Sequence, residues 1–321
     1  MKAAVLHRLG QTPVYEDFPD PVPRQPDEIV LNVKAASVKN LDKLRAGGSH
    51  YASYTKLPVV VGIDGVGELE DGSRVYAAGV TGMIAEKALI RKGQYVVLPK
   101  GLDDSTAAAL PNAGMGAAMA LLSRAGLQKG ERVLINGATG VTGRLAVQLA
   151  RYYGASTIIA TGRNPRSLEQ LTTLGATGVI SLQEDDNDIV RKIKDLHQQS
   201  PVNVVIDYLW GHPAELILQA LGGSGAFTPR VRFVTVGSMA GESITLQSGV
   251  LRSSAIELLG SGIGSLSKAD MEDYYSRVLP EMFQLAANGR LQLPTETAPL
   301  SEIAAAWQKR IDEGKRLVIK I

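Results

Sequence analysis

The sequence predicts an α/β protein that combines a mostly antiparallel β region with a doubly wound parallel sheet. Before residue 112, short apolar runs alternate with turn residues, and from Arg132 onward strand patterns alternate with helix patterns. A glycine-rich turn follows the first strand of that alternating part. Such alternation is typical of a parallel sheet with helices on both faces. The length of 321 residues is enough for two domains.

Composition limits the possible classes of function. Hydrophobic residues make up 45% and charged residues 21%, as in ordinary globular proteins, and the net charge of +2 does not favour a nucleic acid or a membrane surface as partner. The absence of cysteine excludes disulfides and cysteine-ligated metal sites. The amino terminus does not read as a signal peptide, and no stretch reaches the roughly 18 apolar residues of a membrane span. We therefore expect a cytoplasmic protein.

The first part of the chain reads as strands joined by turns. Apolar alternation favours strands, and Asp71-Gly72 is a typical hairpin turn. Four prolines between residues 19 and 26 indicate an irregular connection. The expected strands are 28–36, the hairpin 65–79, 85–90 and 95–99.

The second part alternates strands and helices. The helix expected over 165–175 has Pro165 near its start and Gly175 past its end, where these residues are favoured. The expected strands are 132–136, 156–160, 178–182, 202–209 and 231–237, and the expected helices are 141–155, 165–175, 188–199 and 213–223. A long helix over 268–288 and a strand over 316–321 close the chain.

The segment "VLINGATGVTG" carries the strongest functional signal. Gly137, Gly140 and Gly143 follow a strand and open a helix, where glycine allows a sharp turn and a close approach of phosphate. The helix amino terminus adds free N–H groups and the positive end of a dipole. The context indicates a dinucleotide site, and the structural alternative is three glycines needed for tight packing. The predicted cofactor residues here are Gly137, Ala138, Thr139, Gly140, Val141, Thr142 and Gly143.

The segment "IIATGRN" predicts which cofactor is bound. The second strand ends near Thr161, about twenty residues past the glycines, where the adenine ribose should lie. An acid there would accept the ribose hydroxyls of NAD, but none occurs between Ile158 and Arg166. Arg163 offers a fork of donors suited to a 2′-phosphate, although it could also be an ordinary surface residue. The sequence favours NADPH, held at this end by Thr161, Gly162, Arg163 and Asn164.

Several motifs together resemble a known family over nearly the whole chain. They are "AASVKNLD", "GIDGVG", "ALPNAGMGAAMAL", the glycine turn and the ending "EGKRLVIKI". The chain resembles the zinc-free quinone oxidoreductase branch of the medium-chain dehydrogenase/reductase superfamily. The resemblance implies a GroES-like substrate domain of residues 1–114 with 256–321, and a Rossmann domain of residues 115–255. It also implies a homodimer, because relatives commonly pair the edge strands of their Rossmann sheets, and a tetramer is left open as the alternative.

The resemblance also bears on metal binding. The three positions that hold the catalytic zinc in the zinc enzymes of the superfamily fall on Lys39, Ile63 and Asn112. Lysine is a cation at neutral pH, isoleucine has no donor atom, and asparagine is a poor zinc ligand. We therefore predict that the protein has no catalytic metal.

Without zinc, other groups must stabilise the charge that hydride transfer leaves on a substrate oxygen. The candidates are Lys39, Tyr51 and Asn112, while a salt-bridged or surface position is the alternative for Lys39. Tyr51 resembles a substrate-site tyrosine of the quinone reductases, and the spacing leaves His50 or Tyr54 open instead. Family members usually have a small polar residue where Lys39 stands.

Other residues are expected around the nicotinamide. Met115 and Gly116 match a point where the family contacts this ring, and glycine there leaves only a backbone contact. Gly237 and Ser238 follow a strand whose carboxyl end should face the ligand. Asp64 could act as a general acid, but a carboxylate that caps the local turn is the more ordinary interpretation.

These observations predict an NADPH-dependent, metal-free reductase that transfers hydride to quinones or activated alkenes such as enones. Its partners would be a small-molecule substrate and a second copy of the chain, with no nucleic acid and no membrane. A short-chain-type dehydrogenase would need a Tyr-x-x-x-Lys pair, and no tyrosine here has lysine four residues on. A non-enzymatic NADPH-binding or RNA-associated protein, as crystallin-like relatives suggest, is the second hypothesis.

Overall fold

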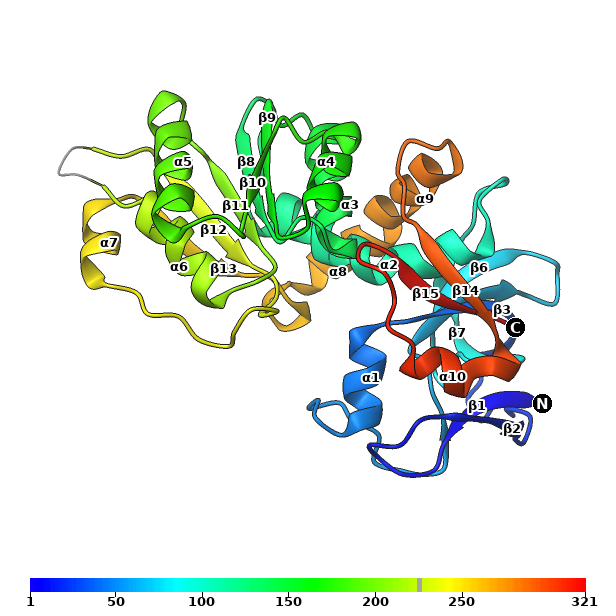
Figure 1. The fold of residues 1–321 in the computed structure, drawn as a ribbon. Coiled ribbons are helices and arrows are strands. Elements are labelled where there is room, and N and C mark those ends of the chain that lie inside the picture. The colour runs from blue at the N-terminus through cyan, green and yellow to red at the C-terminus, as the bar shows by residue number, and fades with distance from the viewer. Residues whose placement is uncertain (224–226) are drawn as a thin grey trace. The chain divides into compact units, whose positions relative to one another are not determined.

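The structure is a computed structural model that describes residues 1–223 and 227–321. The chain divides into two compact units (Figure 1). The first unit contains Met1–Asn112 and Tyr275–Ile321, and the second contains Ala113–Tyr274. The first is mostly antiparallel β and the second alternates strands and helices, which confirms the predicted fold class.

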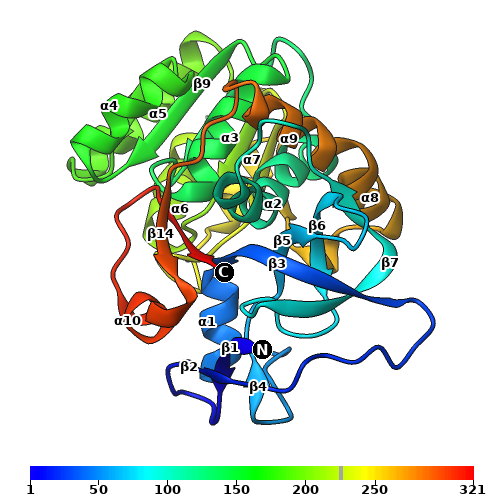
Figure 2. The same ribbon diagram turned by 90° about the vertical axis from the view of Figure 1, so that its right-hand side faces the viewer.

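The first unit contains two sheets. One has the strand order β2-β1-β4, and the other β14-β15-β3-β5-β6-β7, in which only the pair β14–β15 is parallel. The last strand of the chain pairs with β3, and Figure 2 shows the C-terminus beside that strand. The strands are β1 Lys2–Leu6, β2 Val14–Asp17, β3 Glu28–Val38, β4 Val59–Val60, β5 Asp64–Glu68, β6 Arg74–Gly79, β7 Lys87–Val97, β14 Thr295–Pro299 and β15 Arg316–Lys320.

Helices complete the first unit and lead to the second. Apolar side chains from both ends of the chain share one core, among them Leu31, Ile84 and Leu317. The helices are α1 Asn40–Gly47, α9 Leu279–Ala287 and α10 Ile303–Gln308, with a 3₁₀ turn over Leu300–Glu302. Helix α2, Asp104–Met119, begins in the first unit and ends in the second, where a π-helical turn, Ala120–Arg124, follows it.

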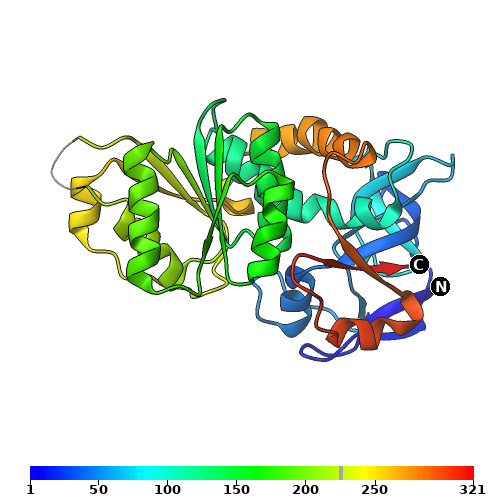
Figure 3. The same ribbon diagram turned by 45° about the horizontal axis from the view of Figure 1, so that its top comes forward.

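The second unit is a six-stranded parallel sheet with the order β10-β9-β8-β11-β12-β13. Helices α5 and α6 cover one face, and α3 and α4 cover the other (Figure 3). The strands are β8 Arg132–Asn136, β9 Thr157–Gly162, β10 Gly178–Ser181, β11 Val204–Asp207, β12 Val231–Thr235 and β13 Ile256–Gly260. The helices are α3 Val141–Tyr152, α4 Pro165–Leu174, α5 Asp186–Gln199, α6 Gly211–Ala220, α7 Ser248–Ser253 and α8 Lys268–Asp273, with a 3₁₀ turn over Ile263–Ser265.

Two features of the carboxyl third differ from the sequence analysis. We placed the return to the first domain at residue 256, but β13 pairs in parallel with β12 and so extends the second unit to Tyr274. The long helix expected over 268–288 is interrupted by a π-helical turn, Tyr274–Val278. Pro280 follows that turn, and its missing N–H cannot continue the α-helical hydrogen bonds. In the described part of the chain, no helix is both long and apolar enough to span a bilayer.

Candidate functional site

The glycine turn lies in the second unit between β8 and α3. Gly137 has φ +79°, and a Cβ added there would lie 2.8 Å from Leu209 Cγ. A Cβ on Gly143 would lie 2.6 Å from the Cα of Ala138. These two glycines are therefore required by the packing of the protein itself, as the structural alternative proposed.

Gly140 is different, because the protein leaves space around it. It is the N-cap of α3, and a Cβ there would lie 3.8 Å from Gly137 O, which is an ordinary van der Waals distance. The first turn of a helix also presents backbone N–H groups that have no carbonyl partner within the helix. Open space in front of such N–H groups fits a phosphate, so the residues present at this turn fit a dinucleotide.

The end of β9 carries two exposed cations. The guanidinium groups of Arg163 and Arg166 have no hydrogen-bond or ion-pair partner within residues 1–223 and 227–321. Asn164 is the N-cap of α4, and its Oδ1 accepts hydrogen bonds from the backbone N–H groups of Arg166 and Ser167. The two free guanidinium groups fit an anion such as a 2′-phosphate.

The structure corrects the prediction for Thr161. Its side chain is fully buried, and its hydroxyl donates to Asn136 Oδ1 at 2.6 Å. Thr161 Oγ1 in turn accepts the N–H of Gly137 at 3.2 Å. The hydroxyl is therefore committed to the interior and does not face a ribose phosphate.

The residues expected near the nicotinamide come together within the second unit. A Cβ on Gly116 would lie 3.2 Å from Thr142 Cγ2, and the Tyr208 hydroxyl donates to Gly116 O at 3.4 Å. Gly237 lies close to Tyr208, because a Cβ there would be 3.0 Å from the Tyr208 carbonyl oxygen. Ser238 donates its hydroxyl hydrogen to Glu242 Oε1 at 2.7 Å.

In the first unit, Lys39 is buried rather than open to a ligand. Its Nζ donates to Ser37 O at 2.9 Å, Ser37 Oγ at 3.2 Å and Asp64 Oδ1 at 2.7 Å. An ammonium has three N–H donors, so none remains for a substrate oxygen. The predicted direct role of Lys39 does not fit this geometry, and the salt-bridged alternative does.

Two carboxylates complete this cluster. Asp42 is buried and accepts the N–H of Lys39 on Oδ2 at 2.9 Å and that of Ile63 on Oδ1 at 3.1 Å. Asp64 also accepts the Tyr76 hydroxyl on Oδ2 at 3.0 Å, so it is fixed from two sides. Burial lowers the pKa of Lys39, but Asp42 and Asp64 outweigh that effect and the pKa is raised. Lys39 is therefore a permanently charged structural cation.

The aromatic residues of segment 50–54 are His50, Tyr51 and Tyr54, and the hydroxyl of Tyr54 is buried. Tyr51 is 90% exposed and stacks against the His50 ring, with 4.1 Å between ring centroids. The Tyr54 hydroxyl is buried and its hydrogen has no acceptor, although the backbone N–H of Gly62 interacts with its oxygen, and the Arg45 guanidinium lies 4.7 Å from its ring centroid. Burial, reinforced by Asp42, raises the pKa of Tyr54, so its phenol keeps its proton. An unpaired buried O–H is costly, which makes Tyr54 the strongest candidate donor of this segment.

The positions expected to replace zinc ligands lie on separate elements. Lys39 precedes α1, Ile63 precedes β5, and Asn112 lies on α2 with its carboxamide unpaired among the described residues. No group of three or more His, Cys, Asp or Glu that could hold a metal occurs in the described ranges.

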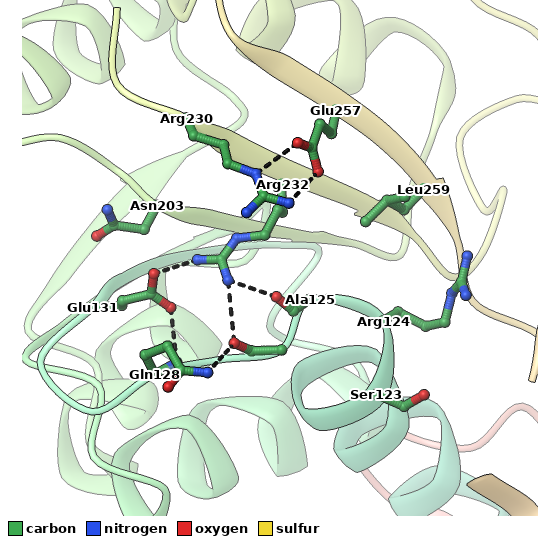
Figure 4. A pocket seen from close by; sticks show the side chains of 11 residues that line it. Ser123, Arg124, Ala125, Gln128, Glu131, Asn203, Arg230, Arg232, Glu257 and Leu259 are labelled. Atoms are coloured by element: carbon green, nitrogen blue, oxygen red, sulfur yellow. Dashed lines mark hydrogen bonds and ion pairs between the residues drawn. The ribbon is translucent and has the colours of Figure 1, made fainter. Parts of the chain in front are cut away.

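A cavity of about 520 Å³ lies at the opposite edge of the parallel sheet from the glycine turn (Figure 4). Its lining includes Glu131, Asn203 and Glu257, which lie at or next to the amino ends of β8, β11 and β13. Arg230 pairs with Glu257 through two hydrogen bonds, and Arg232 pairs with Glu131. Because these arginines are neutralised by carboxylates of the same cavity, it does not read as the cofactor site.

Sequence reasoning missed Asn136, Asp207 and Tyr208, which lie at the carboxyl ends of β8 and β11. The available signal was a polar residue closing an otherwise apolar strand, as in "VLIN" and "VVID". Asp207 is fully buried and accepts a hydrogen bond from Asn136 Nδ2 at 2.8 Å. Burial raises the pKa of Asp207 despite its hydrogen bonds from Leu209 and Asn136.

Comparisons with known proteins agree with this arrangement. The family model described as zinc-binding dehydrogenase matches residues 141–283, a range that contains none of the positions 39, 63 and 112. A probable NADPH-dependent quinone reductase of Emericella nidulans is 29% identical over 96% of this chain and 96% of its own. An acryloyl-coenzyme A reductase of Sulfurisphaera tokodaii is 26% identical over 85% of this chain and 87% of its own.

Solved structures share the fold over the full length. A quinone oxidoreductase from Thermus thermophilus, which was also solved in complex with NADPH, is 27% identical, with a TM-score of 0.77 and full coverage of both chains. The parallel sheet with its glycine turn, the antiparallel unit closed by the last strand, and these relatives lead to one conclusion. These similarities support a quinone oxidoreductase-like protein of the medium-chain dehydrogenase/reductase family.

Proposed function

We propose that the chain is an NADPH-dependent, zinc-independent reductase that transfers hydride to quinones or activated alkenes. The observation that carries the choice of cofactor is the end of β9, where Arg163 and Arg166 are exposed and unpaired among the described residues. A charge-assisted hydrogen bond to a phosphate contributes about 1.5–3 kcal/mol. No carboxylate lies between Ile158 and Arg166 to repel that phosphate.

The substrate class is proposed from the relatives and from the chemistry of the family. The similar proteins include a probable quinone reductase and an acryloyl-coenzyme A reductase. Both names indicate a substrate with a flat, conjugated carbonyl system. When bound, NADPH would supply the hydride to such a compound. The chain's own residues must then bind the carbonyl, orient it and stabilise the negative charge that develops on its oxygen.

We assign that stabilisation to Tyr54 rather than to Tyr51 or Lys39. The Tyr54 hydroxyl is buried and protonated and its hydrogen has no acceptor, so it can donate a hydrogen bond to an oxygen that gains charge. Lys39 acts on Tyr54 as a fixed positive charge, with its own donors committed to Ser37 and Asp64. Asn112 remains a second possible donor, because its carboxamide has no partner among residues 1–223 and 227–321.

The donor set is what supports the proposed zinc independence. The Lys39 ammonium is already paired with the carboxylates of Asp42 and Asp64. Ile63 and Asn112 offer no strong zinc ligand. We therefore propose that hydrogen-bond donors of the site, in place of a metal ion, stabilise the negative charge on the substrate oxygen. Homodimer formation and a cytoplasmic location stay predictions.

A substrate screen that follows loss of NADPH absorbance tests the proposal. We expect oxidation of NADPH with quinones or enones, product formation in equal amount, and slower turnover at equal concentrations of NADH. Tight NADPH binding with no turnover on any quinone, enone or aldehyde would instead favour the non-enzymatic alternative. Absence of NADPH binding would contradict both.

A further inference from the structure

Three fully buried polar side chains lie next to one another at the carboxyl edge of the parallel sheet. Asn136 ends β8, Thr161 lies in β9, and Asp207 ends β11, and each is 0% exposed. The strand order β9-β8-β11 makes the three strands neighbours, and Asn136 and Asp207 are register partners. Burying three polar groups is unfavourable unless all of them are hydrogen-bonded.

Hydrogen bonds join the three side chains to the glycine turn. The Thr161 hydroxyl donates to Asn136 Oδ1 at 2.6 Å, and Asn136 Nδ2 donates to Asp207 Oδ1 at 2.8 Å. The N–H of Gly137 donates to Thr161 Oγ1 at 3.2 Å. Each side chain therefore fixes the next, and the chain of bonds ends on the backbone of the turn.

Asp207 holds the other side of the same turn. It accepts the N–H of Leu209 at 3.0 Å and that of Trp210 at 3.1 Å. Trp210 has φ 52°, the only positive φ of a non-glycine residue in the described part of the chain. The Leu209 side chain packs against Gly137, since its Cγ lies 2.8 Å from where a Cβ of Gly137 would stand. Gly137 is thus held through its N–H by Thr161 and at its Cα by Leu209.

We infer that Thr161, Asn136 and Asp207 are positioning residues for the dinucleotide, which they would not touch themselves. A fully satisfied buried network makes its surroundings rigid, and this one fixes the turn that leads to Gly140 and the start of α3. The inference rests on the proposed function. It differs from the role that the sequence suggested for Thr161, because a residue that fixes the turn serves NADPH and NADH alike.

The test compares cofactor affinities of the wild type with those of Thr161→Val and Thr161→Ser. Valine keeps the shape but leaves the Gly137 N–H and Asn136 Oδ1 without a partner. We expect Thr161→Val to weaken NADPH and NADH binding equally, by ~10- to 100-fold. Thr161→Ser should restore both. Arg163→Ala serves as the matched control, because it should change the ratio of the two affinities and leave NADH binding unchanged.

Titration calorimetry with each cofactor, together with the Tm of each variant, separates the possible outcomes. A Thr161→Val variant whose NADPH to NADH ratio falls would show direct phosphate contact and overturn the inference. Unchanged affinities with a lower Tm would show a merely structural role and would also overturn it. If Thr161→Val does not fold, Asp207→Asn gives a milder form of the test, since its Nδ2 would replace one of the two oxygens that accept the Trp210 N–H, and we expect a smaller but equal loss of affinity for both cofactors. A wild type that binds neither cofactor would overturn the proposed function and this inference together.

Discussion

Lys39 and Asp64 form a buried ion pair, in which Nζ lies 2.7 Å from Oδ1 and the two side chains are 1% and 9% exposed. Asp42 Oδ2 lies 3.2 Å from the same Nζ. Lys39, which we expected at a zinc-ligand position, is therefore an internal cation that holds two carboxylates of the antiparallel unit together.

Replacing this cation should destabilise the fold. Lys39→Met leaves Asp42 and Asp64 buried without their partner, so we expect the free energy of unfolding to fall by about 3–5 kcal/mol. Urea denaturation measures this, with the exposed Lys56→Met as a control that should change it by less than ~0.5 kcal/mol. A loss of similar size in both variants would show that the ion pair has no special role.

The same pair sets a dependence of stability on alkaline pH. The folded-state pKa of Lys39 is raised above 10.5, so the stabilisation is fully present below that pH and is lost as pH rises through the raised value. We expect the stability gap between wild type and Lys39→Met to be constant from pH 6 to 9 and to narrow above about 10.5. A gap that already narrows near neutral pH would contradict this direction of the shift.

Tyr54 and Tyr51 offer a paired test of the substrate-oxygen donor. Tyr54→Phe removes only the buried hydroxyl, and loss of one such donor typically lowers turnover by about 10²–10³. Tyr51→Phe is the matched control, because that side chain is 90% exposed. Steady-state kinetics should show the loss in kcat on an enone, with a smaller loss on a reactive quinone. A loss of turnover in Tyr51→Phe but not in Tyr54→Phe would assign the role of hydrogen-bond donor to Tyr51.

Arg163 should determine the choice of cofactor. One arginine–phosphate contact of about 1.5–3 kcal/mol corresponds to roughly 10- to 100-fold preference for NADPH. Arg163→Ala should remove most of this preference by weakening NADPH binding alone, and Arg163→Lys should keep part of it because the charge remains. Fluorescence titration with both cofactors measures the ratio. Equal wild-type affinities would show that the exposed arginine does not bind the phosphate.

Activity should not depend on a metal. With Lys39, Ile63 and Asn112 at the three positions, we expect no stoichiometric zinc in active protein and no change in rate after treatment with a chelator. Elemental analysis and the NADPH assay measure the two quantities on one preparation. Zinc at one per chain, lost together with activity, would contradict the expectation.

The edge strand β13 should carry the dimer contact. It lies at the end of the parallel sheet and is paired there only with β12, and Leu258 on it is 39% exposed. Leu258→Lys should convert a dimer to a monomer, because a charge would be buried at the contact. Leu251→Lys, a similarly exposed leucine on α7, is the control. Light scattering after gel filtration measures both masses, and a dimer that survives the Leu258 change would exclude this edge.

Local patterns predicted the fold and the glycine turn, because strands, helix ends and tight turns depend on residues that lie close together in the sequence. The role of Lys39 was not predictable, since its partner Asp64 is 25 residues away and only the folded sheet brings them together. Thr161 shows the same limit. Its place at the end of β9 was evident, but whether its hydroxyl faces a ligand or Asn136 depends on a neighbouring strand.

The contact between Gly162 and the glycine turn has a consequence for how this protein could evolve or be redesigned. A Cβ on Gly162 would lie 2.5 Å from Thr139 Cγ2, a buried atom of a branched and stiff side chain. An acidic residue at position 162 therefore could not be introduced without a smaller residue at 139. An acidic residue at the end of β9 therefore needs a second, coordinated change in the glycine turn, and the single variant would carry the clash. The steric fit between the end of β9 and the glycine turn is therefore a barrier to this change.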